Sequence, residues 1–161
     1  MTLIKLSTPK DFFDEVVEPN YNQFMSEPSS FRTAINVAIS LFSMHEWIFE
    51  LSKPKVEKLL GKTFVKKHNL WKHIEGQTSE ACYIRDVANA SKHVRLTINP
   101  STKMTHIANT SIQMVTVGYN SPNPKPARTP SVIMDEQGQA ISFDDCAESM
   151  FKFWQKFIPQ L

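Results

Sequence analysis

Five polar side chains that could act on a phosphodiester bond fall within nine residues of this sequence, the stretch "RDVANASKH" from Arg85 to His93. A histidine can take a proton from a ribose 2′-hydroxyl or give one to a leaving 5′-oxygen. An arginine can hold the phosphate and stabilise its developing charge. Asn89 or Asp86 could orient the histidine. These residue types suit metal-independent cleavage that requires no cofactor.

The spacing predicts that most of these residues share one face of a helix from about Ser79 to His93. At about 100° per residue, one arc of about 100° contains Arg85, Asp86, Asn89 and His93. A solvated face explains the same pattern, because every amphipathic helix has a polar arc. Positive charge at Lys92 and His93 also suits the C-terminal end of a helix dipole. Both interpretations stay open on the pattern alone.

His45, in "SMHEWIF", lies on or beside the apolar stripe of an earlier helix. A lone histidine in that position is commonly a buried group with its hydrogen bonds satisfied. The functional alternative is that His45 faces the 79–93 helix and joins Asn89 or His93. A full functional interpretation assigns catalysis to Arg85, His93, Asn89 and Asp86, and binding to Lys92 and His45. No metal site is expected, because the sequence lacks the Glu-x-x-His pairs of helical-bundle metal centres.

Helices must position these residues. One is expected from Thr8, with Pro9 in its first position and a kink or break at Pro19. A second begins after Ser29 or Ser30 and stops before Pro54. Further helical segments are expected over 54–74, interrupted at Gly61, over 79–93, and from the capping residue Ser142 to about 158.

The stretch between the last two helices has a different pattern. Residues 94–98 and 111–119 are rich in β-branched side chains, and 131–143 predicts a hairpin that turns at Gly138. The expected fold is mainly α (α+β): a bundle of about five helices with a small antiparallel sheet inserted before the C-terminal helix. We expect one domain, 1–161, with a helical part at 8–93 and 142–158 and a β insertion at about 94–142.

The composition indicates the class of protein and its expected cellular location. The chain has 161 residues, 41% hydrophobic and 21% charged, as in ordinary globular proteins. Cys82 and Cys146 form no metal-binding or CxxC pattern, and no signal peptide or membrane span is evident, so we expect a cytoplasmic protein without a membrane partner. Between Lys53 and Lys72 there are seven lysines and one acid, Glu57. This run is either a solvated helix face or a footprint for an anionic partner.

The chain resembles bacterial helical proteins of the HEPN superfamily in three stretches, "HEWIFE", "RDVANASKH" and "SMFKFWQKF". The resemblance implies a small helical bundle, often a homodimer, and in many members a metal-independent endoribonuclease of toxin–antitoxin or defence systems. It implies that Arg85 binds phosphate, that His93 is catalytic and that Asp86 is the polar residue after the arginine. Active members have an R-x(4–6)-H motif, whereas seven residues separate Arg85 from His93 here.

Two functions are therefore expected as alternatives. The first is an RNA-cleaving or RNA-binding protein with RNA, and an antitoxin or other protein, as partners. The second is a non-catalytic protein-interaction or ligand-binding module, in which a structural Asn/His network joins the helices.

Overall fold

A computed structural model describes residues 6–28, 30–91, 132–134 and 140–161 of the chain. These residues form a helical bundle, as expected. Its helices are α1 (Pro9–Phe12), α2 (Glu18–Ser26), α3 (Phe31–Leu60), α4 (Lys67–Glu75), α5 (Ala81–Ala90) and α6 (Phe143–Phe157). None of the helices in the described part of the chain combines the length and apolar character needed to cross a membrane.

The N-terminal segment starts as its sequence predicts. The hydroxyl of Thr8 accepts a hydrogen bond from the backbone N–H of Asp11, whose carboxylate accepts one from the N–H of Thr8. Two otherwise unpaired helix-end donors are thereby satisfied. The expected disruption at Pro19 takes the form of a π-helical turn over Phe13–Val17, directly before α2. A proline removes one backbone donor, and the wider turn accommodates that loss.

Helix α3 is the longest element and is interrupted close to the expected position. Ser30 caps its start by accepting from the N–H of Thr33, and Ser52 leaves helical geometry at φ −137° and ψ 20°. The helix resumes directly after Ser52. Pro54 then lies in the first turn of the resumed helix, where a missing backbone N–H costs little. It ends at Gly61, whose φ of 60° is the left-handed conformation that glycine adopts without strain.

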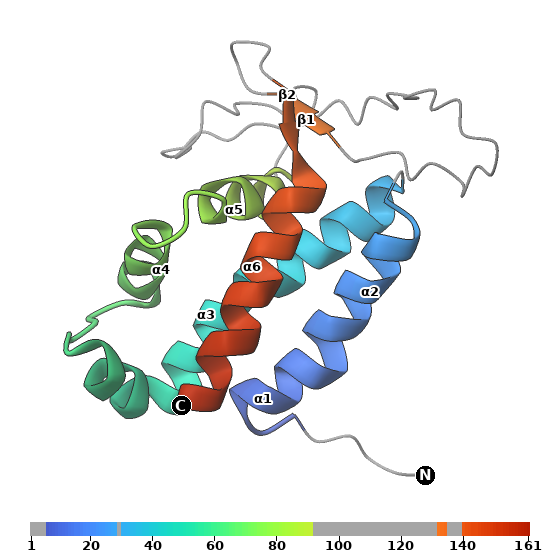
Figure 1. Ribbon diagram of the computed structural model, residues 1–161. Helices are drawn as coiled ribbons and strands as arrows, with labels where there is room; N and C mark the ends of the chain where they lie inside the picture. The colour runs from blue at the N-terminus through green and yellow to red at the C-terminus, as the bar shows by residue number, and fades with distance from the viewer. Residues whose placement is uncertain (1–5, 29, 92–131, 135–139) are drawn as a thin grey trace, which may run out of the picture.

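Figure 1 shows α6 lying between α2 and α5, across α3, and all three helices contact it. Trp154 of α6 is fully buried, and its indole N–H donates to the backbone oxygen of Leu41 in α3 at 3.0 Å. Ser142 caps α6 by accepting from the N–H of Asp145. The buried apolar side chains of these helices form one cluster.

The small sheet expected before the last helix is not confirmed. The described residues contain only two three-residue strands, β1 (Val132–Met134) and β2 (Ala140–Ser142), which pair antiparallel with Ile133 opposite Ile141. A pair this short cannot bury a face of its own. The other expected strands, 94–98 and 111–119, and the expected turn at Gly138 lie outside the described residues.

Candidate functional site

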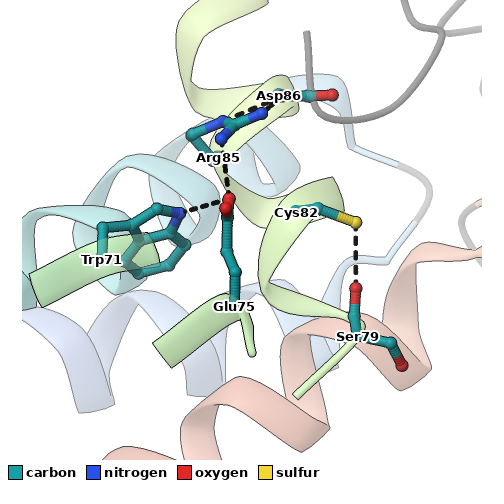
Figure 2. Close-up of polar contacts among 6 residues, drawn as sticks. All are labelled: Trp71, Glu75, Ser79, Cys82, Arg85 and Asp86. Carbon is teal, nitrogen blue, oxygen red and sulfur yellow. Dashed lines mark hydrogen bonds and ion pairs between the residues drawn. The ribbon is translucent and has the colours of Figure 1, made fainter. Parts of the chain in front are cut away.

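Arg85 projects from α5 toward α4 and is held by two carboxylates. Its Nη1 lies 2.8 Å from Oε1 of Glu75, and its Nε and Nη2 lie 3.1 and 3.0 Å from Oδ1 of Asp86. All three guanidinium nitrogens therefore have an acceptor. Figure 2 shows Arg85 reaching from α5 to Glu75 at the end of α4, with Asp86 beside it on α5.

Glu75 is the centre of this cluster. The indole N–H of Trp71, one helical turn earlier on α4, donates to the same Oε1 at 2.7 Å. Trp71 is almost fully buried, so its N–H needs a protein acceptor. Oε1 of Glu75 thus makes one contact within α4, to Trp71, and one contact to α5, at Arg85. We call Trp71, Glu75, Arg85 and Asp86 the Arg85 cluster.

The electrostatics of the Arg85 cluster differ from those of a phosphate site. The side chains of Arg85, Glu75 and Asp86 are 14%, 16% and 2% exposed. One guanidinium faces two carboxylates. Because solvent screens such groups poorly, each carboxylate interacts strongly with the guanidinium. The cluster therefore links α4 to α5 through largely buried charged contacts.

Asp86 corrects the helical-wheel prediction. The wheel placed it on the polar arc, whereas its side chain is buried. The reason is that α5 contacts three neighbours, α3, α4 and α6, so that its buried arc is wider than that of a surface helix. Within the described residues, no hydrogen bond or ion pair joins Asn89 to Arg85. Lys92 and His93 lie outside the described residues.

His45 is buried in α3, in agreement with the structural interpretation. Its Nδ1 donates to the backbone oxygen of Phe42, and its ring centroid lies 4.7 Å from that of Phe42 and 5.2 Å from that of Trp71. Burial lowers the pKa of His45, because an imidazolium would lose its hydration there. Among the described residues no hydrogen bond connects His45 with Asn89, so the expected Asn/His network is not found between them.

Both cysteines are thiols with little nucleophilic character. Cys82 Sγ donates to the backbone oxygen of Ser79, and Cys146 is buried in α6. Burial raises the pKa of Cys82 to about 11 and that of Cys146 to about 12. In the described part of the chain, no group of three or more His, Cys, Asp or Glu side chains is placed to hold a metal ion.

Sequence reasoning missed Glu75 as the partner of Arg85. The pair is separated by a turn between two helices, and no periodicity relates positions 75 and 85. Only the contact between Trp71 and Glu75 had a signal in the sequence, because these residues have the i, i+4 spacing of helix neighbours. Comparisons with protein-family models, with curated proteins and with solved structures find no match to this chain.

Proposed function

We propose that this chain is a non-catalytic binding module built on a helical bundle, in which Arg85 is a structural residue. The observation that supports the proposal is the engagement of every guanidinium nitrogen by Glu75 and Asp86. These contacts occupy each nitrogen of the planar fork that would otherwise bind a phosphate bidentately. Here a phosphate would have to share or displace a carboxylate that already contacts the guanidinium.

The test is an RNA-cleavage assay with the full chain. Labelled single-stranded RNA is incubated with the wild-type protein from about pH 5 to pH 8, the range in which histidine acid–base chemistry operates. The expected result is intact RNA, with wild type, His93→Ala and the matched control His68→Ala giving the same background. Cleavage that persists in EDTA and disappears only in His93→Ala would overturn the proposal.

A metal-independent ribonuclease is a second proposal, favoured by the partial exposure of Arg85 and Glu75. Because both side chains reach the surface, an RNA phosphate could replace Glu75 on the outer edge of the guanidinium. On this proposal Arg85 binds the phosphate, His93 transfers the proton, Asn89 and Asp86 position them, and Lys92 contributes charge. A homodimer and an antitoxin or other protein partner belong to the same proposal.

The variant Glu75→Gln separates the two proposals. It removes the negative charge that attracts Arg85 but keeps an oxygen for the indole of Trp71. If Arg85 serves RNA, this substitution raises RNA affinity or cleavage, measured by fluorescence anisotropy and by gel. If Arg85 is structural, the substitution lowers the free energy of unfolding and leaves RNA binding unchanged.

A further inference from the structure

A pocket of about 580 Å³ lies where the loop after α3 meets α4, away from the Arg85 cluster. Asn69, Lys72, His73 and Gly76 line it from one stripe of α4 and its end, at helical spacing. Residues 62–65 of the loop form the opposite wall. The volume is in the range of small-molecule sites.

The charge of this pocket has one sign. Lys62 and Lys72 line it, both are exposed, and neither forms an ion pair with a described residue. No aspartate or glutamate is among its lining residues. The carboxylate of Glu57 accepts from the backbone N–H of Phe64 and lies 3.9 Å from Lys53 Nζ. The lining residues of the pocket thus include two lysines and no acid.

The pocket also offers an apolar wall and amide groups. Phe64 is buried beneath it, with its ring centroid 5.6 Å from that of His73, whereas Val65 is 80% exposed. Val65 therefore supplies the exposed apolar surface beside the polar groups of the pocket. The amide of Gln77 lies 3.1 Å from Nε2 of His73, so its N–H can donate to the ring and fix the orientation of the imidazole.

We infer that this pocket binds an organic phosphate monoester. A monoester carries about −1.5 to −2 charge at pH 7, which two lysines match, whereas a phosphodiester carries only one negative charge. Lysine is a common phosphate ligand. The organic part of the ligand packs against the exposed side chain of Val65. The inference rests on the proposed function, because it names the ligand class of the binding module.

Isothermal titration calorimetry of the full chain at low salt tests the inference. The soluble probes are 5′-AMP and 3′,5′-cyclic AMP, which share a base but differ as monoester and diester. Vesicles with phosphatidic acid, against phosphatidylcholine vesicles, test whether the monoester is a lipid headgroup. We expect 5′-AMP or phosphatidic acid to bind, and 5′-AMP to bind more tightly than the cyclic diester by about tenfold, the value of one charge-assisted hydrogen bond.

Matched lysine variants locate the site. Lys62→Gln and Lys72→Gln each weaken monoester binding by roughly tenfold, whereas Lys58→Gln, an exposed lysine of the same run outside the pocket, changes it little. Circular dichroism verifies that each variant is folded. Absence of binding to both monoester probes overturns the inference, as does equal weakening by all three substitutions. Neither result bears on RNA cleavage, so the proposed function is judged separately.

Discussion

Glu75 and Arg85 form an ion pair of 2.8 Å between α4 and α5, with both side chains largely buried. The pair occurs because the turn between the two helices brings a carboxylate on one to an arginine on the other. Two consequences follow for the candidate site. The arginine that resembles a phosphate ligand already has acidic partners, and the packing of α4 on α5 depends on a charged contact.

Arg85→Gln should destabilise the protein strongly. The substitution removes the cation that contacts the carboxylate of Glu75, and breaking such a buried pair costs about 3 kcal/mol of unfolding free energy. Urea unfolding followed by circular dichroism measures the loss. The control is Arg32→Gln, because Arg32 pairs with Glu27 at 3.7 Å and both side chains are more than half exposed. That change should cost less than about 1 kcal/mol. Similar losses in the two variants would contradict a structural role for Arg85.

Glu75→Ala should cost more stability than Glu75→Gln. Both remove the charge, but only glutamine keeps an oxygen for the buried indole N–H of Trp71. An unsatisfied buried donor adds about 1–3 kcal/mol. The same unfolding assay measures the difference, with Glu50→Ala and Glu50→Gln as an exposed control pair. If alanine and glutamine at position 75 give equal stability, the bond to Trp71 contributes nothing.

His45 should make the protein less stable in acid. Its pKa is lower in the folded chain than its ordinary value of 6.5, so the unfolded chain binds more protons as the pH falls below that value. The contribution of neutral His45 is therefore complete above pH 6.5 and is lost as the pH falls toward the folded pKa. His45→Asn, which keeps a donor for the carbonyl of Phe42, should flatten this dependence. The measurement is unfolding free energy between about pH 7 and pH 5. Exposed His68→Asn is the control, and an unchanged slope in His45→Asn would refute the assignment.

The two thiols should react slowly in the native protein. With a pKa of about 11 for Cys82 and about 12 for Cys146, at most about one thousandth of either is thiolate at pH 8. Labelling with a chromogenic disulfide reagent should therefore be much slower in buffer than in urea. The variant Cys146→Ala isolates Cys82, the less buried thiol. Native labelling of Cys82 at the rate of the unfolded chain would show that its burial is not maintained.

Signals confined to one turn could be predicted from the sequence. A helix was expected to begin at Thr8, and caps were expected at Ser29 or Ser30 and at Ser142. The hydroxyls of Thr8, Ser30 and Ser142 each accept a backbone hydrogen bond at a helix start. Gly61 was expected to interrupt a helix and ends α3. The predicted end of the helix before Pro54 was confirmed only in part. The backbone departs from helical geometry at Ser52, but the helix resumes and continues to Leu60. The outcome at such a proline depends on packing beyond the local sequence.

The candidate site depended on contacts that periodicity does not encode. A helical wheel separates two sides of α5, but it cannot show that Asp86 on the polar side is buried in the folded chain. The same limit applies to Arg85, whose exposure was expected and whose acidic partner lies on another helix. His45 was easier to assign, because a polar residue within an apolar stripe is buried whichever helix covers it.

The hydrogen bond from Trp154 to Leu41 joins residues 113 positions apart in the chain. Contacts with so large a sequence separation form only after a long loop has closed, and that entropy slows folding relative to a bundle with mainly local contacts. During synthesis, α3 would present its apolar stripe without its α6 partner until the ribosome has released residues 143–157. Over that interval the nascent chain is prone to aggregation. The risk ends when α6 packs against α3 and covers its apolar stripe.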